Sequence, residues 1–200
     1  MKNRVIHFTR GNGLFEQFLA KKRAEIANML ISKKVPKDKV LDIGCGSYPY
    51  FLTTTNFKKK YGIDYSVKTT FVNNPNIILK KTNVELSRLP FENNFFNAIT
   101  MLAVFEHINR ERLEFVLTEI KRVLKKDGIF IITTPSPWSD VLLHLMGKFN
   151  LISSVEIHDH KHHLSQKAIV SSLIEARFRH KNIKKGFFEV DFNMWFVAKK

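Results

Sequence analysis

The sequence predicts an α/β fold: a three-layer αβα sandwich in which helices cover both faces of a mostly parallel β-sheet. The first observation is that short β-rich runs alternate with segments long enough to form helices, which is typical of parallel sheets. The second is that the last two β-rich runs, at 182–188 and 194–198, are joined by a connection too short for a parallel crossover. We therefore expect an antiparallel strand at one edge of the sheet.

The first elements follow in order along the chain. Residues 14–31 carry apolar side chains at spacings that suit one face of a helix, and Asn12 and Gly13 precede them as start signals. The strands are then expected at 40–43, 61–63, 77–79, 98–102 and 129–133, followed by 182–188 and 194–198.

Two later helices are expected between these strands. Residues 111–124 place their leucine, valine and isoleucine side chains on one helical face, and residues 125–128 (Lys-Lys-Asp-Gly) predict a basic last turn with a glycine stop. The second helix is expected at 165–178, with Ser165 as its N-cap.

The composition is that of a compact, basic protein. The chain has 200 residues, of which 44% are hydrophobic and 26% charged, which is enough to build one buried core. Lysine and arginine number 33 against 18 aspartate and glutamate, so the formal net charge is +15. This charge favours an anionic substrate, an acidic membrane surface or nucleic acid as partners, and it says nothing about the fold.

Three features point to a cytoplasmic protein. A single cysteine, Cys45, excludes an intrachain disulfide. The N-terminal residues lack the apolar run that a signal peptide needs. The longest apolar stretch, 141–152, is interrupted by polar residues and is too short to span a bilayer.

The most informative segment is Val-Leu-Asp-Ile-Gly-Cys-Gly-Ser at 40–47, in which a buried strand runs into a tight turn. Gly44 and Gly46 would let backbone N–H groups approach a ligand that a Cβ would block. Asp64 ends the next short strand, where a carboxylate can accept hydrogen bonds from both hydroxyls of a ribose. A glycine turn of this kind also occurs without any ligand.

Two residues argue against a dinucleotide at this turn. Pro49 stands where the dinucleotide pattern has its third glycine, and the charge of Asp42 would oppose a pyrophosphate. The same charge suits an ammonium group. A cationic nucleoside without phosphates is therefore favoured over NAD.

Segments in the same order resemble motifs of the class I S-adenosylmethionine-dependent methyltransferases (methyltransferase type 11-like). VLDIGCGSYPYF at 40–51 resembles the family's first motif, and YGIDYS at 61–66 resembles its acidic second motif. The others are NVE at 83–85 with LPFENNFFNAI at 89–99, EHI at 106–108 and LKKDG at 124–128. The resemblance covers about 40–135.

The resemblance implies a Rossmann-like domain with a seven-stranded sheet over residues 1–200. Its parts would be an N-terminal helical segment (1–38), a cofactor-binding half (40–135) and an acceptor-side half (136–200) with a lid and an antiparallel hairpin. It also implies S-adenosyl-L-methionine as cofactor and S-adenosyl-L-homocysteine as product.

The resemblance further implies the residues that bind this cofactor. Asp42 and the backbone at the glycine turn would face the methionine moiety, and Asp64 would hold the ribose hydroxyls. Tyr65, Asn83 and Val84 would lie beside the adenine. The full set is Asp42, Gly44, Cys45, Gly46, Asp64, Tyr65, Asn83, Val84, Met101, Leu102 and Ala103.

Three residues depart from the family pattern. Tyr48 replaces a third glycine, and Asn83 replaces an aspartate but keeps a carbonyl that can accept from an adenine amine. Asn97 replaces the aspartate of the family's Phe-Asp pair and is expected to be a structural cap.

Two histidines are candidate catalytic bases, and a base is needed only when the acceptor arrives protonated. His107 follows the fourth strand at the carboxyl end of the sheet, where ligands bind in open α/β folds. A structural histidine bonded to a backbone carbonyl is an equal alternative. His163 belongs to the histidine-rich run 158–163, which predicts a substrate-facing wall, a hydrogen-bonding segment or a metal site.

The segment 135–149 combines an aromatic residue with an apolar, helix-like run, and the family usually varies its acceptor pocket here. The run either closes the core or forms a lid over an apolar acceptor. We therefore expect a small-molecule or lipid- or glycan-type acceptor. RNA is less favoured because the basic residues are scattered in pairs, and protein methylation, a non-catalytic nucleoside-binding module and an NAD-dependent oxidoreductase are further alternatives.

Overall fold

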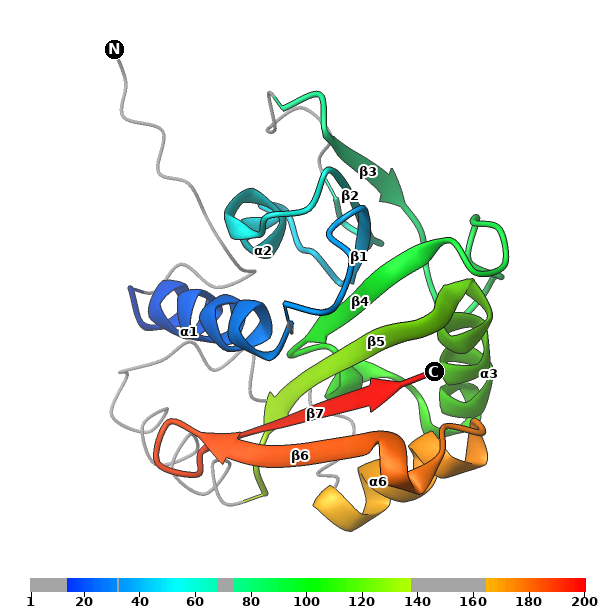
Figure 1. Ribbon diagram of the computed structural model, residues 1–200. Coiled ribbons are helices and arrows are strands. Elements are labelled where there is room, and N and C mark those ends of the chain that lie inside the picture. The colour runs from blue at the N-terminus through cyan, green and yellow to red at the C-terminus, as the bar shows by residue number, and fades with distance from the viewer. Residues whose placement is uncertain (1–13, 32, 68–73, 138–164) are drawn as a thin grey trace.

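The computed structural model describes residues 14–31, 33–67, 74–137 and 165–200 (Figure 1). Within them the strands form one seven-stranded sheet in the order β3-β2-β1-β4-β5-β7-β6. The strands are β1 Lys39–Ile43, β2 Lys59–Asp64, β3 Ile77–Lys81, β4 Phe96–Leu102, β5 Leu124–Pro135, β6 Ile183–Phe188 and β7 Asn193–Lys199. The helical elements are α1 Leu14–Leu30, α2 Tyr50–Thr54, η2 Phe105–His107, α3 Arg110–Val123, α6 Gln166–Glu175 and η3 His180–Asn182.

The sheet is mostly parallel, as the sequence predicts. Strands β3, β2, β1, β4 and β5 pair in parallel, whereas β7 runs antiparallel to both β5 and β6. The antiparallel strand therefore lies one position inside the sheet, and β6 forms its edge. Every strand expected from the sequence is present, and each observed strand contains its predicted range or overlaps it.

Helices cover the two faces of the sheet with separate hydrophobic clusters (Figure 1). Helices α1 and α2 pack on one face, where Ala27 and Leu52 join Val40 of β1. Helices α3 and α6 pack on the other, against Leu41 and its neighbours. Because successive strand side chains point to opposite faces, buried residues alternate between the two clusters along β1 and β5.

The glycine stop predicted for the helix at 111–124 is wrong. Helix α3 ends at Val123, and residues 125–128 belong to β5, whose first residue Leu124 pairs with Phe96. The carbonyls at the end of α3 are instead bound by Lys200, whose Nζ lies 2.6 Å from the oxygens of Lys121 and Leu124. The tertiary structure supplies the C-cap that the local sequence suggested glycine would supply.

The two ends of helix α6 compare differently with their predicted positions. Helix α6 ends at Glu175, three residues before its predicted end, because Arg177 takes a left-handed conformation (φ 65°). Ser165 is its N-cap, as predicted, and its hydroxyl accepts a hydrogen bond from the N–H of Ala168. Among the described residues no helix is long and apolar enough to cross a membrane.

Candidate functional site

The loop after β1 is fastened to the end of β2. The N–H groups of Gly44 and Cys45 both donate to the carbonyl of Ile63, at 2.8 and 3.3 Å. Gly44 has a φ of +75°, and a Cβ at this position would lie 2.2 Å from a methyl carbon of Val104, in the loop after β4. Glycine at 44 is therefore required both by the backbone conformation and by packing against Val104.

Asp64 ties this loop to the residues that follow β2. Its carboxylate is 8% exposed; Oδ2 accepts from the N–H of Gly46 at 3.1 Å, and Oδ1 accepts from the N–H and the hydroxyl of Ser66, both at 2.7 Å. A carboxylate offers about four acceptor positions, so room for about one further donor remains. The ribose contact expected for Asp64 remains a prediction.

Asp42 is the second buried carboxylate at this end of the sheet. It is 4% exposed, and its Oδ1 accepts a hydrogen bond from the hydroxyl of Thr100 at 2.7 Å. Burial raises the pKa of Asp42 to about 7, the Thr100 hydroxyl opposes this rise, and the charge of Asp64 adds to it. We call Asp42 and Asp64 the acidic centre. Within the described residues neither carboxylate forms a salt bridge, although the chain carries a net charge of +15.

The acidic centre fits the cationic nucleoside that the sequence resemblance implies. S-adenosylmethionine carries an ammonium and a sulfonium group, and a cation near a desolvated carboxylate favours its charged form. Such a ligand would lower the raised pKa of Asp42. A neutral or phosphate-bearing ligand would leave the two buried carboxylates uncompensated.

The residues expected beside the adenine lie close to Asp64 along the sheet. The N–H of Thr82 donates to the carbonyl of Asp64 at 3.0 Å, and Asn83 follows directly. The side-chain oxygen of Asn83 accepts from the N–H of Glu85 at 3.0 Å, so it already closes a turn. Val84 packs against the core, whereas Tyr65 is half exposed.

The end of β4 brings the last three predicted cofactor residues beside β1. Met101 pairs with Ile43 and is fully buried in the hydrophobic core, so its side chain contributes packing. Leu102 is partly buried, and Ala103 has a left-handed conformation (φ 54°), with its N–H bonded to the carbonyl of Thr133 at 2.9 Å.

Cys45 is buried between the two glycines. Its burial, and then the charges of Asp42 and Asp64, raise the pKa of the thiol well above its usual range. A thiol of this kind forms almost no thiolate near neutral pH and is a poor nucleophile. This agrees with its interpretation as a small packing residue whose backbone belongs to the loop.

Of the two candidate bases, His107 lies within the described residues and His163 lies outside them. His107 is partly buried in η2, directly after the loop that contacts Gly44. Its neighbour Glu106 is 4% exposed, and Oε2 of Glu106 has no hydrogen-bond partner among the described residues. His163 and the rest of the 158–163 run lie outside the described residues, as does most of the predicted lid at 135–149.

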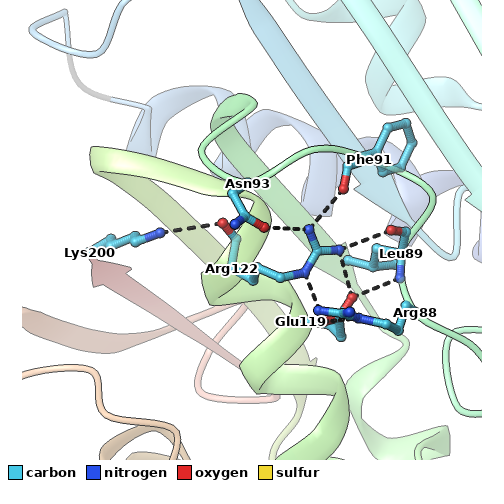
Figure 2. A network of polar contacts seen from close by, with 7 residues as sticks. All are labelled: Arg88, Leu89, Phe91, Asn93, Glu119, Arg122 and Lys200. Carbon is cyan, nitrogen blue, oxygen red and sulfur yellow. Dashed lines mark hydrogen bonds and ion pairs between the residues drawn. The ribbon is translucent and has the colours of Figure 1, made fainter.

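The sequence analysis missed a polar network that holds the loop before β4 (Figure 2). Glu119 of α3 accepts from the N–H of Leu89 at 2.9 Å and from Arg88 at 3.3 Å. Arg122 donates to Glu119 at 2.7 Å and to the carbonyls of Leu89 and Phe91 at 3.0 and 2.9 Å. We call Arg88, Glu119 and Arg122 the loop clamp. The signal available in the sequence was an acidic residue on the apolar face of a helix, three positions before an arginine.

Asn97 has the structural role that the sequence predicts. Its side-chain oxygen accepts from the N–H of Lys39 at 3.1 Å and from Nζ of Lys125 at 3.4 Å, which joins the starts of β1, β4 and β5. Asn97 thus helps to position β4 against its neighbours.

Comparison with known proteins gives a matching family and several relatives. Residues 41–132 match the family described as "Methyltransferase domain". An uncharacterised protein of Methanocaldococcus jannaschii is 37% identical over 108 residues, which cover 52% of this chain and 40% of that protein. A second uncharacterised protein of this organism is 28% identical over 125 residues, covering 61% and 53%. The chain thus spans about half or less of the curated relatives it matches.

Solved structures share the fold at low sequence identity. A SAM-dependent methyltransferase from Archaeoglobus fulgidus superposes with a TM-score of 0.66 at 16% identity, covering 94% of this chain and 100% of that one. A phosphoethanolamine N-methyltransferase of Haemonchus contortus, in complex with phosphomonomethylethanolamine and S-adenosylhomocysteine, has a TM-score of 0.62 at 14% identity and covers 90% and 52%. Residues 41–132 of the chain therefore match a methyltransferase domain, and the fold is that of solved class I S-adenosylmethionine-dependent methyltransferases.

Proposed function

We propose that this chain transfers a methyl group from S-adenosylmethionine to a small-molecule or lipid- or glycan-type acceptor. The observation that carries the cofactor assignment is the acidic centre, two buried carboxylates side by side at the carboxyl ends of β1 and β2. The proposed unit is a single domain over 1–200, with a cofactor-binding half at 40–135 and an acceptor-side half at 136–200.

Each residue of the site has a proposed task. Asp42 would balance the charge of the methionine moiety, and Asp64 would accept from the ribose while it holds Gly46. The bound cofactor supplies a methyl group on a sulfonium leaving group. The chain itself must orient the acceptor and exclude water, and proximity then supplies much of the rate enhancement.

Exposed apolar residues at the end of the sheet that carries the site support the proposed acceptor class. The turn between β6 and β7 lies there, because Asn193 pairs with Pro135 and the N–H of Ser136 donates to the carbonyl of Phe192 at 2.8 Å. Val190 and Phe192 in this turn are 89% and 37% exposed. Exposed apolar side chains at the same end of the sheet as the site favour an acceptor with an apolar part.

We further propose His107 as the general base when the acceptor is a hydroxyl or a similar protonated group. His107 lies in the short helix that follows β4, near the site. A positioned general base typically contributes about 10²–10⁴-fold to the rate, so its removal should cost a factor of this order. His107→Asn should lower kcat while the dissociation constant for S-adenosylmethionine stays within about twofold of wild type. Loss of cofactor binding in this variant would assign His107 to the cofactor site instead.

Isothermal titration with S-adenosylmethionine tests the cofactor site. Asp64→Asn should weaken binding by about tenfold or more, because it removes one charge-assisted hydrogen bond and half of the acidic centre. Glu92→Gln removes the same charge from an exposed loop position and serves as control. Equal affinity in the two variants would contradict the proposal.

The acceptor is tested with methyl-labelled cofactor. The protein is incubated with fractionated small molecules, lipids and RNA, and the label is followed into each fraction. Label in the small-molecule or lipid fraction supports the proposal. Label in RNA alone would select the second candidate, a nucleic-acid methyltransferase, which the formal net charge of +15 favours.

A further inference from the structure

A basic cleft lies at the end of the sheet opposite the acidic centre. It has a volume of about 490 Å³ and is formed by the ends of α3, α6 and β7, the start of β5 and the η3 segment. Seven of its ten described lining residues are lysine or arginine, and one, Asp127, is acidic. From Asp127 to Thr133, beside the end of β4, the strand rises roughly 20 Å, so the cleft is remote from the site.

The charges of the cleft are only partly compensated within the described residues. Asp127 pairs with Lys199 at 2.8 Å, and its charge is thereby used. Lys121 donates to the carbonyl of Arg177, and Lys200 donates to carbonyls at the end of α3. The four remaining cations form no salt bridge in the described part of the chain, and all are exposed: Lys126, Arg177, Arg179 and Lys181.

The partly buried lysines of this cluster, Lys121 and Lys200, are under electrostatic stress. Burial lowers the pKa of Lys121, and the charges of Arg177 and Arg179 lower it further. Burial likewise lowers the pKa of Lys200, with added repulsion from Lys121 and Arg122. A bound anion would relieve this repulsion between the cations.

The cationic surface extends along the same end of the sheet. Lys39 at the start of β1 is in register with Lys59 of β2, and Lys58 precedes it; Lys58 and Lys59 are exposed. Strand β2 is separated from β7 by four inter-strand steps, which is roughly 20 Å. One small anion cannot use cations spread over this distance, whereas a polymer with regularly spaced charges can.

We propose that the basic cleft and the adjoining lysines at the amino ends of β1 and β2 bind the phosphate backbone of a nucleic acid, with single-stranded RNA as the probe. Guanidinium groups suit phosphates because they donate two parallel hydrogen bonds. An anionic membrane fits less well, because none of the large exposed apolar residues described lines the cleft, and such residues add to the membrane affinity of a basic surface.

The test is fluorescence anisotropy of a labelled single-stranded RNA with the full chain, in the absence of S-adenosylmethionine. Arg179→Gln/Lys181→Gln should weaken binding by about tenfold at physiological salt and reduce the salt slope by about 1.4, the value for two lost phosphate contacts. Both side chains are exposed, so the fold should be kept; a wild-type circular dichroism spectrum and melting temperature establish this. Arg179→Glu/Lys181→Glu should weaken binding further.

The matched control is Arg110→Gln/Lys167→Gln. It removes the same charge from exposed positions at the other ends of α3 and α6. RNA binding that is unchanged in the cleft variant, or equally weakened in the control, would overturn the proposal. Binding to phosphatidylserine vesicles without binding to RNA would overturn it as well. Because no cofactor is present, these outcomes are independent of those that test methyl transfer.

Discussion

At the scale of single residues, burial changes the chemistry of Asp42 and Cys45. Both lie in or beside the loop after β1, and both are more than nine-tenths buried. Desolvation disfavours the charged form of each group, so the pKa of both is raised. For Asp42 this brings the pKa to about 7, into the range where small changes in pH alter its charge.

Cofactor affinity should depend on the charge of Asp42. Because the pKa of Asp42 is about 7, the carboxylate takes up a proton as pH falls below this value, and the attraction for a cationic ligand is lost. The dissociation constant for S-adenosylmethionine should rise by up to about tenfold for each pH unit below 7. Isothermal titration with S-adenosylmethionine between about pH 5 and 7 measures this change in the dissociation constant. Asp42→Asn should bind weakly at every pH; a variant with the wild-type profile would contradict the role of Asp42.

The raised pKa of Asp42 makes the stability of the cofactor-free chain fall as pH rises, whereas cofactor affinity rises with pH. The folded chain without cofactor holds the proton of Asp42 more tightly than the unfolded chain, whose value is 3.8. The stability contributed by Asp42 is therefore present below about pH 4 and lost as pH rises through about 7.

Cys45 should resist thiol reagents in the native protein. Its raised pKa and its burial leave little accessible thiolate. We expect negligible reaction with a disulfide reagent at neutral pH and complete reaction of one thiol after unfolding in urea. Rapid native reaction would show that the loop opens and exposes the sulfur.

At the scale of elements, the loop clamp joins α3 to the loop before β4. Glu119 and Arg122 satisfy backbone groups of Leu89 and Phe91 that no sheet or helix partner reaches (Figure 2). Arg122 lowers the pKa of Glu119, although burial opposes this, which is the sign of a favourable ion pair. The clamp therefore positions the loop that leads into β4.

Glu119→Gln should destabilise the chain by about 1–3 kcal/mol, because the backbone N–H of Leu89 and the guanidinium of Arg122 lose a charged partner. Thermal unfolding measures the effect, with Glu114→Gln, an exposed position on the same helix, as control. Since the pKa of Glu119 is held below 4.5, the difference from wild type should be present above that pH and fade as pH falls through the lowered value. A difference that persists in strong acid would argue against the ion pair.

At the scale of the whole molecule, the acidic centre and the basic cleft lie at opposite ends of the sheet. The acidic centre lies at the carboxyl ends of β1 and β2, and the basic cleft lies near the amino end of β5. A cationic cofactor and a polyanion would thus bind at separate ends. The net charge of +15 is concentrated partly in the cleft, where it opposes the compact state.

Salt should therefore stabilise the protein. Raising the ionic strength to about 0.1 M shortens the screening length to about 10 Å and weakens repulsion across the cleft. Each kcal/mol relieved should raise Tm by about 2–4 °C. The increase should be smaller in Arg179→Gln/Lys181→Gln than in Arg110→Gln/Lys167→Gln, as measured by thermal unfolding in KCl. Equal increases would mean that the repulsion is spread over the whole surface.

The sequence alone determined the order of the seven strands, the three longer helices and the position of the glycine loop, whereas the short elements α2, η2 and η3 were not predicted. Alternation of β-rich runs with helical segments is local information, and Gly44 with Asp64 follows from the spacing of two strands. The resemblance at 40–135 agrees with the matched domain at 41–132. The predicted cofactor contacts remain predictions, because they depend on a bound molecule.

Only the tertiary structure decided the contacts that join distant parts of the chain. Lys200 caps a helix that ends at Val123, Glu119 binds a loop thirty positions earlier, and the cations of the basic cleft come from four separate elements. Such contacts depend on how strands and helices pack against one another. In the sequence, the cations of the cleft are only scattered lysines and arginines. The physical reason is that charge and hydrogen bonding act through space, whereas periodicity records only the local backbone.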